Sequence, residues 1–158
     1  MSTDEGFALV HLPGEGRAID MGAFSMTVKA DSADTGGAFS LLEADEPAGF
    51  GPPMHTHEDA AEAFYVLEGE YLIFIRDREL LCPAGSFVYI PAGVTHGFRV
   101  GKVQSRKLNI YAPAAMVGYF DELSRAVSDG VPLDEGRLAA VAERFSMRLL
   151  GPVPEGYA

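Results

Sequence analysis

Apolar and polar residues alternate in short runs over the middle of the chain. Between about residues 39 and 111, runs of β-forming residues are separated by Gly, Pro and Asp, and helical periodicity is absent. Short strands with turn residues between them are typical of an all-β sandwich or barrel. We therefore predict strands over residues 39–43, 63–67, 71–75, 86–90 and 108–111.

The connections between these runs predict antiparallel hairpins. Gly69 lies between two glutamates and separates the second run from the third, and residues 76–79 form a polar turn after the third. The run 63–67 is apolar on both faces, which predicts a strand that is covered on both sides. Its cover would be the N-terminal segment 24–28, or the C-terminal helices of this chain or of a partner subunit.

The apolar period changes after Pro113. Residues between 116 and 127 and between 138 and 145 show helical spacing, and Gly130 and Pro132 separate the two stretches. Asp134 is a suitable N-cap for the second helix. The sequence therefore predicts two C-terminal helices whose apolar stripes serve packing.

The length of 158 residues suits one domain with one hydrophobic core. We expect three parts within it: N-terminal strands that pack on the barrel (1–35), a barrel core (36–112), and C-terminal helices and a tail (113–158). The single cysteine, Cys82, has no neighbour in sequence that would activate a thiolate, so we expect it to be a small packing residue.

The charge balance limits the partners. The chain has 12 Lys and Arg against 23 Asp and Glu, and its net charge of −11 would repel nucleic acid and an anionic membrane surface. No apolar run approaches the roughly 18 residues of a transmembrane helix. Residues 1–5 lack the basic start of a secretory signal, so we expect a cytoplasmic protein.

Three of the four histidines lie beside turn residues with a glutamate among them. His55 and His57 are two residues apart, so on an extended segment both imidazoles project to the same face. Glu62 begins the next predicted strand and could approach the same point, and folding would have to bring His96 there. The fourth histidine, His11, is expected at the surface.

Three neutral imidazoles and one carboxylate suit a first-row divalent metal ion. Such a set would leave about two positions of a hexacoordinate ion open for water, oxygen or substrate. A closed structural zinc site more often uses thiolates, which this chain does not offer. The four side chains therefore indicate a metal site at which chemistry is possible.

The spacing of these residues resembles the two motifs of the cupin superfamily. Residues 49–69 contain Gly49, His55, His57, Glu62 and Gly69 in the pattern G(X)5HXH(X)4E(X)6G. Residues 85–100 match the second motif, G(X)5PXG(X)2H(X)3N, except that Val100 stands in place of Asn. The surrounding sequence is similar to single-domain cupins described as quercetin 2,3-dioxygenase-like.

The resemblance implies an all-β double-stranded β-helix, the jelly-roll or cupin barrel, with two C-terminal α-helices. It implies one divalent transition metal ion (Fe, Ni, Mn, Co, Cu or Zn) held by His55, His57, Glu62 and His96 at the mouth of the barrel. It further implies homodimers and, in the enzymatic members, oxygen-dependent cleavage of flavonol-like substrates. In those enzymes the ligand glutamate also handles a substrate proton, a role that would fall on Glu62.

A small-molecule pocket would lie beside the metal. Strand parity places Phe64 on the face of Glu62 and Phe98 on the face of His96. Lys102, Arg106 and Lys107 form a weak basic cluster that we expect to be a solvated edge. The residues that we expect to line the pocket are Phe64, Phe98, Met54, Val66 and Val100.

Three functions fit these residues. The first is a metal-dependent dioxygenase that acts on a small aromatic or enolizable substrate, with Glu62 as its catalytic base. The second is a non-catalytic cupin that binds metal and a small molecule, and the third is an isomerase or lyase. An aromatic and aliphatic pocket would favour the first, whereas a pocket lined by Arg and Lys would favour the third.

Overall fold

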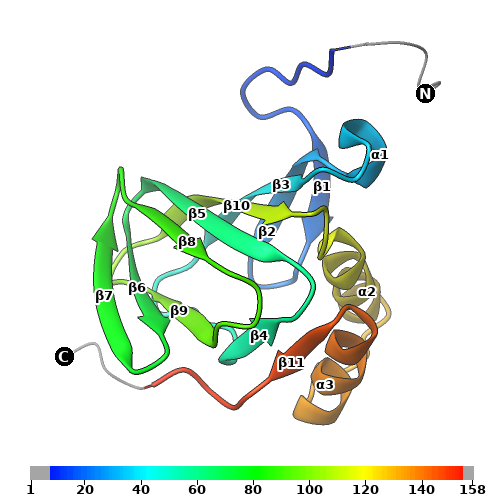
Figure 1. The fold of residues 1–158 in the computed structure, drawn as a ribbon. Coiled ribbons are helices and arrows are strands. Elements are labelled where there is room, and N and C mark those ends of the chain that lie inside the picture. The colour runs from blue at the N-terminus through cyan, green and yellow to red at the C-terminus, as the bar shows by residue number, and fades with distance from the viewer. Residues whose placement is uncertain (1–7, 155–158) are drawn as a thin grey trace.

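The computed structural model describes residues 8–154, so residues 1–5, used above to argue against a signal, lie outside the described residues. Two antiparallel sheets make up most of this part of the chain (Figure 1). The first sheet has the order β1-β2-β3-β10-β5-β8. Its strands are β1 (Arg17–Asp20), β2 (Ser25–Ala30), β3 (Ser40–Glu46), β10 (Ser105–Ala112), β5 (Ala61–Glu68) and β8 (Phe87–Ile90).

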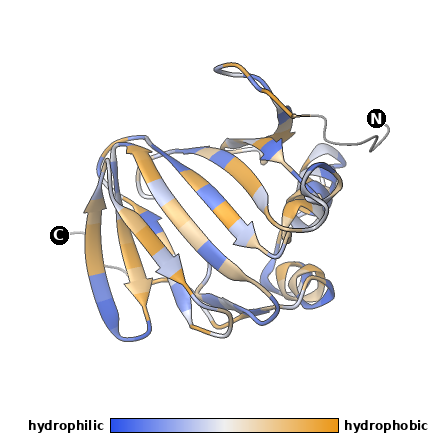
Figure 2. Ribbon diagram, turned by 45° about the horizontal axis from the view of Figure 1, so that its top comes forward, coloured by the Kyte–Doolittle hydropathy of each residue, from blue (hydrophilic) through white to orange (hydrophobic). Residues whose placement is uncertain are grey.

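The second sheet has the order β11-β4-β9-β6-β7 and faces the first across the core (Figure 1). Apolar and polar positions alternate along the strands, as Figure 2 shows, so each sheet turns one face inward. The result is a jelly-roll barrel. The strands of the second sheet are β11 (Met147–Leu149), β4 (His55–His57), β9 (His96–Val100), β6 (Glu70–Ile75) and β7 (Arg78–Pro83).

The sequence pattern missed β4, β7, β9 and β11. β4 has three residues, and its partner β11 comes from the far end of the chain, with Arg148 opposite Thr56. The segment 76–79, predicted as a turn, contains a turn only at residues 76–77, because Ile75 already pairs with Arg78. β7 is an edge strand that begins with two exposed charged residues, Arg78 and Glu79, and these hide the start of the strand pattern.

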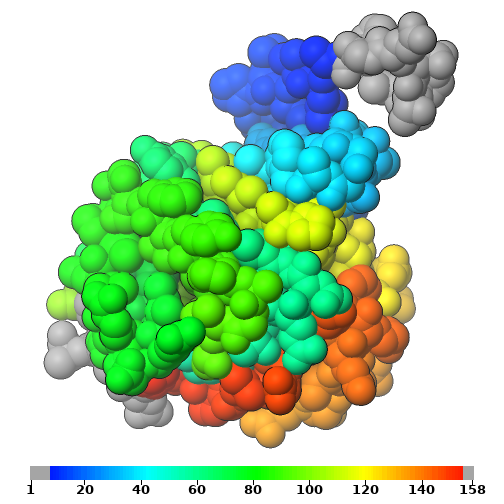
Figure 3. All heavy atoms as spheres, in the orientation of Figure 1, coloured from blue at the N-terminus to red at the C-terminus, as the bar shows by residue number. Residues whose placement is uncertain are grey.

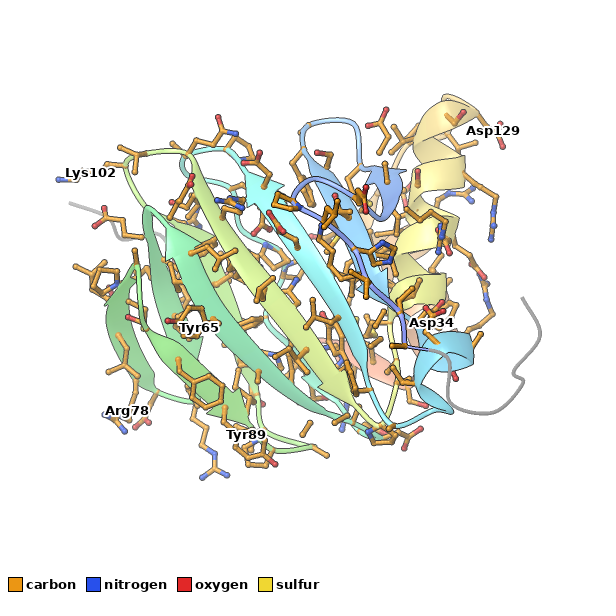
Figure 4. All side chains as sticks on the ribbon, turned by 90° about the horizontal axis from the view of Figure 1, so that it is seen from above. Asp34, Tyr65, Arg78, Tyr89, Lys102 and Asp129 are labelled. Carbon is orange, nitrogen blue, oxygen red and sulfur yellow. The ribbon has the colours of Figure 1, made fainter. Side chains whose placement is uncertain are left out.

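The prediction that the strand at 63–67 is covered on both sides was wrong. Phe64 and Val66 are buried in the barrel, but Tyr65 points outward and is 41% exposed. The segment 24–28 extends the sheet beside β3 instead of lying over β5. Tyr65 and Tyr89 lie at the surface in Figure 4, and the register of β5 and β8 places Tyr65 opposite the exposed Phe87.

The two predicted C-terminal helices are present as α2 (Val117–Ser128) and α3 (Glu135–Arg144), and a short helix, α1 (Ser32–Thr35), precedes β3. Asp134 caps α3, because its side chain accepts a hydrogen bond from the backbone N–H of Arg137. The helices cover one end of the first sheet, as the yellow and orange spheres of Figure 3 show. No helix within residues 8–154 is both long enough and apolar enough to cross a membrane.

The apolar stripes of both helices contribute to a buried cluster with residues of β1, β2 and β3. Leu123 of α2 and Val141 of α3 are buried in one cluster with Met26 and Leu42. The guanidinium of Arg17 donates two hydrogen bonds, of 2.7 and 3.0 Å, to the carboxylate of Asp121 and ties β1 to α2. The helices therefore hold the N-terminal strands at the end of the barrel.

The close approach of Gly69 to β10 generates a prediction about stability. Gly69 has a φ of +74°, and an added Cβ would lie 2.1 Å from Oγ and 2.9 Å from Cα of Ser105. Gly85 has a φ of +91° with nothing within 4 Å of the added Cβ, so Gly85→Ala is a matched control. Both substitutions pay about 1–2 kcal/mol for left-handed backbone, and Gly69→Ala adds an overpacking cost of about 1–3 kcal/mol.

Urea unfolding of both variants measures the difference. We expect Gly69→Ala to lose clearly more free energy of unfolding than Gly85→Ala. Equal losses would show that Ser105 moves aside at no cost, and the argument from close approach would then fail.

Candidate metal centre

The fold brings His55, His57, Glu62 and His96 to one point. One ligand atom from each side chain lies within 4.8 Å of those of the other three, and all four residues are buried. Nε2 of His57 is 2.7 Å, and Nε2 of His96 is 3.3 Å, from Oε2 of Glu62. The pairing of β4 with β9 sets His55 opposite His96, while Glu62 comes from β5 in the other sheet.

Backbone carbonyls orient two of the imidazoles. Nδ1 of His55 lies 2.7 Å from the carbonyl oxygen of Pro53, and Nδ1 of His96 lies 2.9 Å from that of Val94. A carbonyl oxygen only accepts, so each Nδ1 carries a proton, and in the neutral ring Nε2 is then the atom that can bind a metal ion. Such outer partners fix the tautomer that a metal ligand needs.

The electrostatics of the cluster favour a positive charge at its centre. Burial, reinforced by His96, lowers the pKa of His55 to about 3, so this imidazole is neutral at pH 7. Burial would raise the pKa of Glu62, but the adjacent His57 and His96 outweigh it and hold that pKa well below its usual value. Burial would lower the pKa of His96, but its hydrogen bond to Glu62 and the charge of that carboxylate raise it. Metal binding requires neutral imidazoles, so an ion that binds here would displace a proton shared by His96 and Glu62.

The residues fit a divalent metal ion. Nδ1 of the buried His57 has no hydrogen-bond partner among residues 8–154, and its Nε2 forms no aligned hydrogen bond despite its short distance to Glu62. Ligand atoms that face a common centre instead of each other are arranged for a shared cation. The three imidazoles and one carboxylate of this site, like the sequence motif, suggest a divalent metal without fixing its identity.

Tyr111 is a site residue that the sequence analysis missed. It lies opposite Glu62 in the register of β10 and β5, and its hydroxyl is hydrogen-bonded to the Glu62 carboxylate. Burial, with Glu62 adding to it, raises the pKa of Tyr111 well above its usual value, so the phenol stays protonated. The alternation of residues along β10 could have revealed Tyr111, because it shares the inward face of the strand with Asn109 and Lys107.

A cavity of about 290 Å³ opens beside the four ligands. His55, His57 and Glu62 line it together with Glu46 of β3 and polar side chains of β10. The remaining walls are apolar and come from the turn between β1 and β2, from residues 50–53 and from the helices. Among these apolar residues are Met21, Phe24, Phe50, Tyr119, Phe120 and Leu138.

The residues that the sequence analysis assigned to a pocket divide between this cavity and the core. Phe98 lines the cavity, whereas Phe64, Val66 and Val100 pack in the apolar cluster that fills the barrel. Met54 packs against Leu72, Phe74 and Val153 in a separate cluster. Val100, which replaces the motif's Asn, is 1% exposed within the apolar cluster.

The prediction of a solvated basic edge was wrong for Lys107. Its side chain is fully buried inside the barrel, where Nζ lies 2.9 Å from Oε1 of Glu46 and 4.2 Å from the ring centre of Phe98. Its neighbour Arg106 points to the outer face and pairs with Glu43. Adjacent strand residues face opposite sides, and no local pattern reveals a partner 61 residues away.

Residues 41–106 match the family model described as Cupin domain. Over 116 residues the chain is 27% identical to the quercetin 2,3-dioxygenase of Bacillus subtilis (strain 168). This match covers 73% of the present chain and 33% of the relative, so the chain spans about a third of that protein.

Solved structures with the same fold have different names. KdgF from Halomonas sp. superposes with a TM-score of 0.58 at 16% identity, over 65% of this chain and 92% of that one, which is a likeness of fold alone. The polyketide cyclase RemF from Streptomyces resistomycificus superposes with a TM-score of 0.51 at 28% identity, over 63% and 69% of the two chains. Proteins with unlike names thus share this fold.

The geometry of the cluster predicts the metal content of the purified protein. We expect close to one divalent transition metal ion per chain when neither chelator nor metal is added, as measured by elemental analysis. His96→Ala removes one of the four ligands and should reduce the metal content several-fold. His11→Ala is the matched control, since His11 is exposed and outside the cluster. Loss of metal from both variants, or from neither, would contradict the assignment.

Proposed function

The chain belongs to the cupin superfamily, and from that premise we propose that it is a metal-dependent enzyme of the dioxygenase type, acting on a small aromatic or enolizable substrate. The observation that carries this proposal is the position of three of the four ligands, His55, His57 and Glu62, on the wall of a mainly apolar cavity. Its volume of about 290 Å³ is near the lower end of small-molecule sites, which suits a compact ligand.

The side chains around the cavity support an aromatic substrate. Phe24, Phe50 and Phe98 provide faces on which a planar ring can pack, and Tyr119 and Phe120 add to them from α2. Lys107 is the single Lys or Arg side chain among the described lining residues, and Glu46 neutralises it. The balance favours the dioxygenase hypothesis over a reaction on a small, strongly charged substrate.

The metal ion, when bound, would supply Lewis-acid and electron-transfer chemistry to an oxygen substituent of the substrate. Fe, Ni, Mn, Co, Cu and Zn are all compatible with imidazole and carboxylate ligands, so the donor set leaves the native ion to be measured. With three imidazoles and one carboxylate as ligands, about two positions of a six-coordinate ion would remain open to ligands from the cavity.

We assign the proton chemistry to Glu62 and its orientation to Tyr111. Glu62 is ionised, because His57 and His96 keep its pKa low, so its carboxylate can accept a proton from a substrate hydroxyl. The protonated hydroxyl of Tyr111 holds this carboxylate in place by a hydrogen bond. The apolar walls limit the access of water to the proton being transferred.

The second candidate is a reaction without oxygen consumption, of the isomerase, lyase or cyclase kind. The likeness to the polyketide cyclase RemF, at 28% identity, favours it, since that protein is named for ring formation. Metal, cavity and Glu62 would serve this chemistry equally well. Oxygen consumption therefore separates the two candidates.

We also propose that the protein is a homodimer. The outer face of β5 and β8 exposes Tyr65, Phe87 and Tyr89 next to one another, and no described segment of the chain covers them. Tyr65 and Tyr89 mark this face in Figure 4. Contiguous exposed aromatic residues are typical of protein interfaces, and a second copy would bury the same face on both chains.

Oxygen uptake by metal-replete protein tests the proposed reaction. We expect consumption with at least one member of a panel of flavonols and other enolizable phenols. Glu62→Gln should lower kcat by about a hundredfold or more, because a general base is lost. Glu58→Gln is the matched control, since Glu58 lies just before β5 but is exposed and pairs with Arg148.

The metal content of each variant is measured alongside, because Glu62 is also a ligand. Tyr111→Phe keeps all four ligands and should lower kcat by about tenfold through loss of one hydrogen bond to Glu62. Substrate conversion without oxygen consumption would favour the second candidate. Metal-replete protein that converts no panel member would favour the non-catalytic binding protein.

Light scattering tests the homodimer. The wild-type protein should have the mass of two chains, and the double variant Phe87→Lys with Tyr89→Lys should have the mass of one. Leu81→Lys, at an exposed position on β7 in the other sheet, should remain dimeric. A wild-type protein with the mass of one chain would contradict the proposal.

A further inference from the structure

One wall of the cavity is a row of polar side chains on β10. Lys107, Asn109 and Tyr111 are buried, alternate with outward-facing residues and all line the cavity. Tyr111 lies opposite Glu62. Asn109 is two residues from Tyr111 along β10, so their Cα atoms are about 7 Å apart. A small molecule in the cavity can therefore contact the metal ligands and Asn109 at the same time.

Asn109 has a hydrogen-bonding group that the protein leaves unused. The residue is 4% exposed, and its side-chain oxygen accepts no hydrogen bond from residues 8–154. Buried amides are usually paired, because burial without a partner costs free energy. An unpaired amide on the wall of a cavity is therefore a group placed for a ligand.

Next along the row, Lys107 and Glu46 form a buried ion pair. Nζ of Lys107 donates to Oε1 of Glu46 at 2.9 Å, and the hydroxyl of Tyr71 donates to the same oxygen at 2.9 Å. The ring centre of Phe98 lies 4.2 Å from Nζ. Both charged residues line the cavity, and their opposite charges cancel. The pair can bond to a neutral oxygen group, whereas Glu46 would repel a carboxylate.

We infer that Asn109 and the Lys107–Glu46 pair form a second substrate subsite, which binds an uncharged hydroxyl or carbonyl group of an aromatic molecule. The other oxygen of that molecule would face the metal ligands. The substrate class is then a neutral, planar aromatic compound with oxygen substituents at both ends. The inference rests on the proposed function for what happens at the metal end, but binding at the subsite needs no turnover.

Calorimetric titration of the metal-replete protein without oxygen tests the subsite. The probes are naphthalene-2,6-diol and 2-naphthol, which differ by one hydroxyl. The wild-type protein should bind the diol about tenfold more tightly, which corresponds to about 1.4 kcal/mol. In Asn109→Leu this ratio should fall to about one. Equal affinities in the wild-type protein, or a preference that survives in Asn109→Leu, would overturn the inference.

A control variant separates binding from structure. The hydroxyl of Thr56 is also buried and unpartnered, but Thr56 does not line the cavity, so Thr56→Val should leave the ratio unchanged. Asn109→Leu removes an unpaired buried amide and should not lower the midpoint of urea unfolding. If Asn109→Leu lowers both the midpoint and the ratio, Asn109 has a structural role and the inference fails.

The charge of the subsite is tested with 6-hydroxy-2-naphthoate, in which a carboxylate replaces one hydroxyl of the diol. The wild-type protein should bind it about tenfold more weakly than the diol, and Glu46→Gln, which leaves the positive charge of Lys107 unopposed, should remove or reverse that preference. An unchanged preference in Glu46→Gln would overturn the role of the ion pair.

None of these measurements uses oxygen uptake, so the two proposals can fail separately. A protein that shows the expected probe preferences but consumes no oxygen with any phenol supports the subsite and contradicts the dioxygenase proposal. A protein that consumes oxygen, but whose preference for the diol does not depend on Asn109, supports the dioxygenase proposal and contradicts the subsite.

Discussion

The structure depends on keeping an ionised carboxylate inside a protein core. Glu62 is almost fully buried, and such a charge is tolerated only where positive charge or hydrogen-bond donors surround it. Two imidazole nitrogens and the hydroxyl of Tyr111 do so here. Since these groups come from both sheets, the barrel has to close before the charge is compensated. Closure of the fold and assembly of the site are therefore one requirement.

The same barrel holds a second buried charge, Glu46, which the protein balances internally with Lys107 instead of with a cation from solution. The two buried carboxylates therefore differ. The charge of Glu46 is balanced by Lys107 of the same chain, whereas the charge of Glu62 favours the binding of a cation. Asn109 lies between Lys107 and Tyr111 on β10 with its oxygen unpaired. The unpaired amide of Asn109 costs stability, but it places a hydrogen-bonding group inside an apolar cavity.

The sequence predicted what depends on local spacing and left open what depends on register. The two histidines of β4, the turn glycines and the helical stripes lie close together along the chain, so the barrel, the helices and the candidate ligands could be predicted from it. The role of Lys107 could not, because its partner Glu46 is distant in sequence and the pairing of β3 with β10 brings them together. Phe64 and Val66 were predicted to line the pocket for a related reason. Strand alternation predicts which side chains point inward, but it does not tell the residues of the barrel core from those of the cavity.

The candidate metal ligands and most of the apolar cavity wall come from different parts of the chain. The candidate metal ligands lie on β4, β5 and β9, within the part of the chain that matches the cupin model. Most of the apolar residues that line the cavity lie outside that match, among them those of the turn between β1 and β2 and of α2 and α3. Changes in these outer elements can reshape the space for a substrate without moving a ligand. Because similar proteins are named as a dioxygenase and as a cyclase, what the cavity binds is better sought in these walls and in the polar row of β10 than in the four ligands.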